Sequence, residues 1–437
     1  MKRLLCLVLV IIMTMLAGCT ANVAEDNELI DNETLQEPVN ESKPVSPVLL
    51  TSVTYPESAA ADDHERRYEL MEENKVSEPF KLQVNDFALK TAASVIKDGE
   101  NFNYSPASLY FAMAIAANGA NGDTQKEILD LMNLSSKEDL SEVTTLYRLL
   151  YKDNEAFKLK IANSVWLDDS FTFKEDFIRA AQDEHYAQIY TADLPKKETG
   201  EAIGNWISEH TNGTLEPKVE LSDSTIMTIV NTVYFNDKWS SPFDAQMTEK
   251  GTFHAASGDI PVDFMKKSGT GAGVVKNDEY QKVTLGFTGG SRIMFIMPTD
   301  GTGVGDLMKD TERLAAMIDE PGQSVGNLHL TLPKFTFKTD IDIKEALEQM
   351  GVTNMFSGMA DFSNMSDDPA RISQIKQGTY ISLDEEGVEA SAYTMMMAVA
   401  TAMLSGEETL TFDRPFIYAI FSEGVIIFMG TVENPAL

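Results

Sequence analysis

Two short patterns in the sequence could carry enzymatic chemistry, and each lacks the context that its chemistry needs. Gly322-Gln323-Ser324-Val325-Gly326 fits the G-x-S-x-G nucleophile elbow, in which a serine occupies a tight turn between a strand and a helix. Here the pattern lies in a Pro- and Gly-rich connection before a predicted strand at Leu328, so we interpret it as a chance match. Gly301-Thr302-Gly303-Val304-Gly305 is too short for a dinucleotide-binding fingerprint.

The metal-ligating residue types show no pattern of a metal site. The histidines form no H-E-x-x-H motif and no pair at helical spacing, which a zinc site on a helix would need. They are His64, His185, His210, His254 and His329. We therefore predict no catalytic constellation, no metal and no cofactor, and we expect a protein that is not an enzyme.

The long connection between Asp384 and Pro415 is the most unusual part of the chain. A strand should end at Ile381–Leu383 and another should begin at Leu410–Phe412, and loops of the intervening length are usually functional or disordered. Val388–Thr401 contains no proline and no glycine and is mainly Ala, Val, Thr, Met and Tyr. Such residues can pair into a sheet if a gap is offered. The pattern indicates a segment that moves between a loop and a strand.

This connection resembles a known family. Glu385–Thr394, E-E-G-V-E-A-S-A-Y-T, is similar to the hinge of the reactive-centre loop of inhibitory serpins, and Phe412–Phe416 and Phe428–Pro435 resemble the closing strands of that family. Further serpin-like motifs occur in the family's order between Phe80 and Pro435. They are Asn103–Ser108, Gly119–Thr124, Ile161–Leu167, Ile203–Gly213, Thr225–Phe235, Asn236–Trp239 and Pro242–Phe243.

Strands and helices are mixed without βαβ alternation and without internal repeats, which predicts an α+β class and one continuous domain. The resemblance implies the serpin fold over residues 79–437: three mixed β-sheets, about nine helices and an exposed reactive-centre loop at about 385–411. Thr225–Phe235 is almost continuously apolar and β-branched, with Asn231 as its one strongly polar residue, and should be a strand buried on both faces. Leu328–Lys338 alternates strictly and should be one half-buried strand.

The resemblance implies a suicide-substrate inhibitor whose cleaved loop enters the main sheet. The loop hinge is assigned to Glu385, Gly387, Val388, Glu389, Ala390, Ser391, Ala392, Tyr393 and Thr394. Gly387 provides a backbone pivot, and the small residues after it can enter a sheet interior, whereas Glu389 would point the other way. Tyr393 is larger than the family's usual residue, and Gln377 stands where the family often has a buried histidine. The alternative is a non-inhibitory serpin that acts as a binding or structural surface protein.

The bait residue follows from the resemblance. The seventeenth residue counted from Glu385 is Thr401, so the reactive bond would be Thr401–Ala402, with Met403 and Leu404 as alternatives. No Lys or Arg lies between Glu385 and Asp413, which excludes trypsin-like targets. Thr and Ala suit an elastase-like pocket, and Met and Leu suit chymotrypsin- or subtilisin-like proteases. Serine proteases are the expected partners, with cysteine proteases as a further class.

Three buried polar residues, Ser105, Ser108 and Asn231, match the serpin shutter beneath the main sheet. The alternative is that they are polar core residues satisfied by local hydrogen bonds. Trp239 lies under the hinge in relatives, but we assign it to the core.

The N-terminus carries a targeting segment. Lys2-Arg3 precedes the apolar run Leu4–Leu16, which is short for a membrane span, and Leu16-Ala17-Gly18-Cys19 resembles a bacterial lipobox. The resemblance implies a signal peptide over residues 1–18 and a lipid on Cys19; an ordinary secretory signal is the alternative. Because Cys6 would be removed, the exported chain would have no disulfide. We expect a lipid-anchored protein on the extracellular face of a bacterial membrane.

Residues 19–78 are acidic and rich in Asn, Ser, Pro and Thr, and their composition predicts a flexible tether. The whole chain of 437 residues has a formal charge of −33. This charge argues against binding to nucleic acid or to an anionic membrane surface, so contact with a membrane should be through the lipid anchor only. We expect a monomer.

Overall fold

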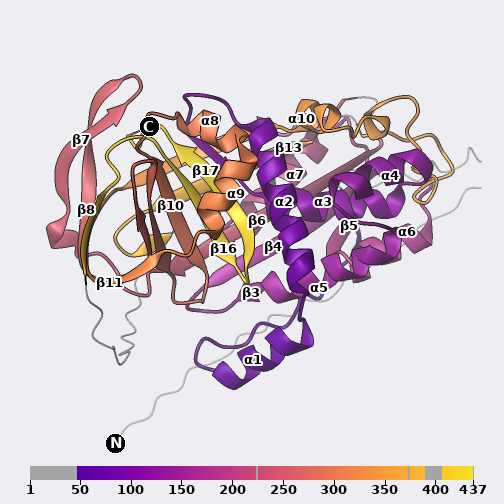
Figure 1. The fold of residues 1–437 in the computed structure, drawn as a ribbon. Helices are drawn as coiled ribbons and strands as arrows, with labels where there is room; N and C mark the ends of the chain where they lie inside the picture. Colours follow the sequence, from indigo (N-terminus) through magenta and orange to yellow (C-terminus); the bar gives the residue numbers. More distant parts are fainter. Residues whose placement is uncertain (1–46, 223–224, 373–374, 389–405, 437) are drawn as a thin grey trace, which may run out of the picture. The chain divides into compact units, whose positions relative to one another are not determined.

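The computed structural model describes residues 47–222, 225–372, 375–388 and 406–436, whose strands form two sheets (Figure 1). The first, here called the main sheet, runs in the order β1 (Val48–Thr51), β5 (Ala187–Ala192), β4 (Lys158–Asp168), β6 (Met227–Lys238), β14 (Gly387–Val388), β13 (Lys376–Leu383) and β12 (Phe335–Asp342), with β3 (Lys152–Asp153) beside β4. The second runs in the order β15 (Glu407–Thr411), β11 (Gln323–Pro333), β8 (Gly258–Lys276), β9 (Tyr280–Gly286), β10 (Arg292–Pro298), β16 (Phe416–Ser422), β17 (Val425–Val432) and β2 (Phe102–Tyr104), with β7 (Glu249–Ala255) beside β8.

The predicted α+β class is confirmed, and the strands join into two sheets where three were expected. The reason is the 19-residue strand β8, which pairs with β7 and β11 and also with β9. One long strand thus connects two groups of strands that we expected to be separate. Parallel pairs (β4 with β5, β11 with β15) occur among antiparallel ones, so both sheets are mixed.

The described residues contain ten α-helices, close to the nine predicted. They are α1 (His64–Glu73), α2 (Glu78–Val95), α3 (Pro106–Gly119), α4 (Gly122–Leu131), α5 (Leu140–Leu150), α6 (Glu175–Asp183), α7 (Lys197–His210), α8 (Val304–Lys309), α9 (Thr311–Asp319) and α10 (Lys344–Gln349). Short 3-10 helices occur at η1 (Lys137–Asp139), η2 (Ala245–Met247) and η3 (Asn354–Phe356). Within this described part, no helix has the length and apolarity needed to cross a bilayer.

Helix α3 lies between the two sheets, because it contacts both β6 and β17, and Figure 1 shows it beside α2. Ser105 caps it by accepting a hydrogen bond from the Ser108 backbone N–H, and Pro106 occupies the first turn, where a missing N–H costs nothing. Nearly all of its residues are buried, as the predicted all-round apolar helix requires. A smaller cluster that includes Trp166 and Trp206 joins α7 to the opposite face of the main sheet.

The single strand predicted over Leu328–Lys338 is wrong. The segment forms two strands that end and begin on either side of Lys334, and they belong to different sheets. Pro333 has no backbone N–H to continue the ladder, and the Lys334 N–H donates to the carbonyl of Asp263 at 3.0 Å. Both halves alternate buried and exposed side chains, so the local pattern does not reveal the break.

The prediction of a flexible tether is wrong for residues 47–78, because these residues form β1 and α1 and belong to the same compact unit as the rest of the described chain. Strand β1 pairs antiparallel with β5, with Leu49 opposite Tyr190. Further along, the Tyr55 ring stacks on Tyr151 at a centroid distance of 5.3 Å, and the Asp153 N–H donates to Ser58 Oγ at 2.9 Å. A few apolar and aromatic residues of this polar segment, such as Leu49 and Tyr55, thus pair or pack with residues of the folded domain. Residues 19–46 lie outside the described residues.

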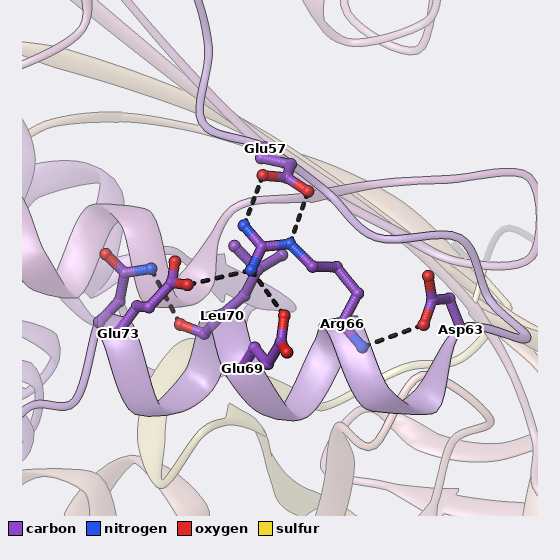
Figure 2. Close-up of polar contacts among 7 residues, drawn as sticks. Glu57, Asp63, Arg66, Glu69, Leu70 and Glu73 are labelled. Atoms are coloured by element: carbon purple, nitrogen blue, oxygen red, sulfur yellow. Dashed lines mark hydrogen bonds and ion pairs between the residues drawn. The ribbon is translucent and has the colours of Figure 1, made fainter.

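Helix α1 is linked to the segment before it by one arginine (Figure 2). The Arg66 guanidinium donates to both carboxylate oxygens of Glu57, at 2.8 and 2.7 Å, and to Glu69 and Glu73 on the helix itself, at 2.9 and 3.0 Å. Asp63 caps the helix by accepting from the Arg66 N–H at 3.0 Å. These contacts close the chain between residues 57 and 73 into a compact turn.

Candidate functional site: the loop hinge in the main sheet

The first residues of the expected loop lie inside the main sheet. Gly387 pairs with Lys238 and Val388 with Asp237 of β6, and Val388 also pairs with Leu383 of β13. A Cβ on Gly387 would meet the Asp237 carbonyl oxygen at 2.3 Å, so this position accepts only glycine. Because both residues are buried, the expectation of a loop exposed from residue 385 is wrong at its start.

Strands β6 and β13 are joined only through β14 in the described part of the chain, since no ladder pairs them with each other. A narrow cavity of about 20 Å³, room for about one water molecule, continues below Val388. It is lined by Thr211, Thr214, Leu215, Val233, Tyr234, Phe235, Tyr380, Ile381, Val388, Ile420 and Phe428. The cavity is therefore lined by side chains of both β6 and β13, which share no ladder in the described residues.

Trp239 holds the backbone of the hinge. Its N–H donates to the Glu386 carbonyl and its Nε1–H to the Asp384 carbonyl, both at 2.9 Å, and the Phe243 N–H donates to the Glu385 carbonyl at 3.0 Å. Its ring is buried and stacks on Phe287 at 4.7 Å. We assigned Trp239 to the core alone, and the structure gives it this second role.

The Glu385 carboxylate anchors the start of the loop. Lys334 Nζ lies 2.7 Å from it, Thr248 Oγ1 donates to it at 2.7 Å, and 12% of its side chain is exposed. Burial alone would raise the pKa of Glu385, but the hydrogen bonds from Lys334 and Thr248 lower it below the usual value. Lys334 is the residue between β11 and β12, so the break in that predicted strand supplies the cation for the hinge.

Asp237 is a buried carboxylate at the position opposite Val388. It accepts hydrogen bonds from Thr288 Oγ1 at 2.8 Å, from the Gly289 N–H at 3.0 Å and from the Lys238 N–H at 2.9 Å, and no ion pair to it occurs in the described residues. Burial raises its pKa to about 6, although these hydrogen bonds act to lower it. The sequence analysis did not predict a role for Asp237. A carboxylate near the end of the largely apolar strand β6 could have indicated a buried charged group.

The predicted shutter residues fall into two hydrogen-bonded groups. Ser105 exchanges two hydrogen bonds with Gln377, both at 2.9 Å, and its Oγ donates to the Ile427 carbonyl and accepts from the Ser108 N–H. Asn231 instead donates to Asn163 Oδ1 at 2.5 Å. Asn231 Oδ1 is buried and has no hydrogen-bond partner in the described residues. Asn163, which the sequence analysis did not single out, therefore belongs with Asn231.

The far end of the predicted loop is also a strand, because residues from Glu407 onward form β15 beside β11. His329 Nε2 lies 2.9 Å from Glu407 Oε1, and Lys276 Nζ donates to the Thr409 carbonyl at 2.7 Å. Ser324 of the G-x-S-x-G pattern lies within β11 and not in a strand-to-helix turn. No group of three His, Cys, Asp or Glu residues among those described could hold a metal.

Several predicted site residues lie outside the described residues, and their roles stay predictions. They are Cys19, the hinge residues Glu389, Ala390, Ser391, Ala392, Tyr393 and Thr394, and the candidate bait residues Thr401, Ala402, Met403 and Leu404.

The Asp237 carboxylate predicts a pH-dependent loss of stability. Its pKa is about 6 in the folded chain and about 4 when unfolded, so the native state binds the extra proton between these values. The contribution of Asp237 to the free energy of unfolding should therefore fall by about 2–3 kcal/mol as the pH rises from 4 to above 6, while buried His185, whose pKa is lowered to about 4, acts in the opposite direction. Asp237→Asn should lack this fall in urea unfolding, whereas Asp176→Asn, at a site with a 93% exposed side chain, should keep it. Equal pH dependence in both variants would contradict the assignment.

Comparisons with known proteins agree with this geometry. A profile of the serpin (serine protease inhibitor) family matches residues 82–435. An uncharacterized serpin-like protein of Thermococcus kodakarensis is 27% identical over 399 residues, which cover 88% of this chain and 92% of the relative. Alpha-1-antiproteinase S of Cavia porcellus is 28% identical and covers 77% of this chain and 85% of its own. The native state of tengpin, a thermophilic serpin, superposes with a TM-score of 0.76 at 26% identity, covering 89% of this chain and 100% of tengpin.

The profile match extends from within α2 to the residues after β17, so it contains both sheets except β1, together with α3 and the hinge. Strand β1 and helix α1 precede its first residue. The chain therefore belongs to the serpin family, whose members are generally protease inhibitors and not enzymes.

Proposed function

We propose that this serpin is a suicide-substrate inhibitor of extracellular serine proteases. A target protease would cleave the loop and form an acyl bond to it, and the loop would then enter the main sheet as an added strand. The observation that supports this proposal is the position of Gly387 and Val388, which are paired between β6 and β13 where those strands share no ladder in the described residues. Because Gly387 and Val388 already pair in the sheet, insertion of the loop would extend β14 from Val388 towards later residues.

The register of β14 defines where later residues would come to lie. Val388, Leu383 and Asp237 are buried on the core side, so every second loop residue after Val388 would face the core. In this register Ala390 comes opposite Phe235 and Ile381, Ala392 opposite Val233 and Thr379, and Thr394 opposite Asn231 and Gln377. Insertion in this register would therefore place small side chains in the core. The Thr394 hydroxyl would also reach the buried Asn231 Oδ1, which lacks a donor in the described residues.

The same register bears on the bulky Tyr393. It would face away from the core and come opposite Gly378 of β13, where no side chain competes for space. A Cβ placed on Gly378 meets only Leu215, at 3.8 Å. The size of Tyr393 is therefore no obstacle to insertion in this register, and Leu215 would pack against its ring.

The bait bond in this proposal is Thr401–Ala402, with Met403 and Leu404 as alternatives. The absence of Lys and Arg from the loop favours elastase-like or subtilisin- and chymotrypsin-like targets, with cysteine proteases as a further class.

Incubation with an elastase-type protease should give a covalent complex that survives boiling in SDS, because acylation is trapped before hydrolysis. Mass spectrometry of the released C-terminal fragment would locate the cleaved bond. Thr401→Arg should add complex formation with a trypsin-type protease, which the unchanged chain should not give. Quantitative cleavage without any complex would contradict inhibition.

Cleavage of the loop should also raise the melting temperature by about 10 °C or more, because an inserted strand adds many backbone hydrogen bonds of roughly 1 kcal/mol each. Ala392→Arg should abolish this gain, since residue 392 would face the core. Glu389→Arg is the matched control and should keep the gain, because residue 389 would face outward. Differential scanning calorimetry of native and cleaved samples measures both.

A non-inhibitory serpin that acts as a binding or structural surface protein is the competing function. It would be cleaved without forming a complex and without a gain in melting temperature. Both outcomes together would replace the inhibitor proposal.

We also propose that the protein is held on the extracellular face of the bacterial membrane by a lipid on Cys19. The support is the sequence Leu16-Ala17-Gly18-Cys19 after a short apolar run. Mass spectrometry of the exported protein should find a diacylated N-terminal Cys19, and Cys19→Ala should release the protein from the membrane fraction. An exported chain that begins at another residue would contradict the anchor.

A further inference from the structure

A cavity of about 420 Å³ lies between helix α1 and the body of the domain, and two of its lining residues, Thr288 and Gly289, also donate hydrogen bonds to Asp237 beside the hinge. One side is formed by the segment from Glu57 to Met71, which includes the start of α1. The other side is formed by the end of α5, by the residues around β3, and by the turns at Thr288–Gly290 and Glu423. Small-molecule sites typically occupy about 300–1,000 Å³.

Two guanidinium groups line this cavity without a carboxylate partner. Neither Arg67 nor Arg148 makes an ion pair in the described residues, and Arg67 Nε is buried without a hydrogen-bond partner there. The chain has 35 basic and 68 acidic residues, so an arginine near its surface should readily find a carboxylate. Two arginines without a carboxylate partner in one cavity therefore indicate a binding site for an anion that is not part of the chain.

The carboxylates of the cavity are already occupied. Glu57 is held by both arms of the Arg66 guanidinium, as Figure 2 shows, and Glu423 pairs with Lys152 at 2.5 Å. His64 Nδ1 contacts Arg67 Nη2, so the partner of this guanidinium in the cavity is an imidazole and not a carboxylate. Glu57 shares Arg66 with Glu69 and Glu73, and Arg148 Nε donates to the Tyr186 hydroxyl at 2.5 Å. Arg67 and Arg148 are thus the cations of the cavity lining that have no carboxylate partner in the described residues.

Much of the remaining wall is apolar or aromatic, with Ser58, Asn154 and Thr288 as its polar residues. Phe157, Tyr151, Leu149 and Met71 all line the cavity, and the Arg67 guanidinium lies 5.9 Å from the centre of the Phe157 ring. An inorganic anion would leave this apolar surface uncovered. An anion that carries a flat apolar body would bury it and still reach the guanidinium groups.

We propose that this cavity binds a small organic anion, namely a carboxylate with an aromatic body. The carboxylate is held by Arg67 and Arg148, and the aromatic body packs against Phe157 and Met71. The cavity adjoins the hinge through Thr288 and Gly289, but the proposed ligand contacts are on Arg67, Arg148, Phe157 and Met71. Binding can therefore be measured whether or not the chain inhibits proteases.

Naphthalene-1-acetate is a suitable probe, and naphthalene-1-acetamide is its neutral counterpart of nearly equal shape. Isothermal titration calorimetry with the full chain in detergent-free buffer should show saturable binding of the carboxylate at one site, with a Kd below about 1 mM. The amide should bind at least tenfold more weakly, since a charge-assisted hydrogen bond contributes that much or more.

Arg67→Gln and Arg148→Gln should each weaken binding of the carboxylate at least tenfold and leave binding of the amide unchanged. Arg179→Gln is the matched control, because Arg179 lies on α6 and its side chain is 64% exposed. Circular dichroism would confirm that the variants fold, and Arg148, which is exposed, carries the test if Arg67→Gln disturbs α1. Equal affinity for the carboxylate and the amide, unchanged affinity in both folded variants, or no saturable binding would overturn the proposal.

Discussion

The main sheet is organised around two neighbouring strands, β6 and β13, that share no hydrogen-bond ladder in the described residues. Strands β6 and β13 face each other in the middle of the main sheet, and in the described residues they are joined only through the two residues of β14. Backbone N–H and C=O groups that lack partners within a sheet cost free energy unless water reaches them. One strand added between β6 and β13 would therefore give hydrogen-bond partners to the facing edges of both. Gly387 and Val388, which lead into the predicted loop, already pair there.

Several polar groups gather around the hinge, at one end of the main sheet. Trp239 fixes the backbone from Asp384 to Glu386, and Lys334 and Thr248 fix the side chain of Glu385. Asp237 is different, because it is buried without a cation in the described residues and has its pKa raised to about 6. A buried carboxylate without a cation is destabilising at neutral pH. Hydrogen bonds and an ion pair thus hold the start of the loop, and the buried carboxylate of Asp237, which lowers stability at neutral pH, lies beside it.

The N-terminal segment shows how composition can mislead. Residues 47–78 are polar and acidic, yet β1 pairs with β5 and Tyr55 stacks on Tyr151. Contacts to residues more than 90 positions away order this segment, although no periodic pattern within it predicts a fold. The same docking encloses the cavity beside α1, in which Arg67 and Arg148 face apolar walls.

The sequence by itself determined the α+β class, the serpin family and the buried helix α3, because these follow from local composition, motif order and the apolar run after Pro106. It also excluded the nucleophile elbow, since the required strand–turn–helix context is local. Only the tertiary structure decided that Leu328–Lys338 divides between two sheets, that Asn231 pairs with Asn163, and that Trp239 and Lys334 hold the hinge. Each of these depends on partners distant along the chain, and hydrophobic periodicity records which face of an element is buried but not which element covers it.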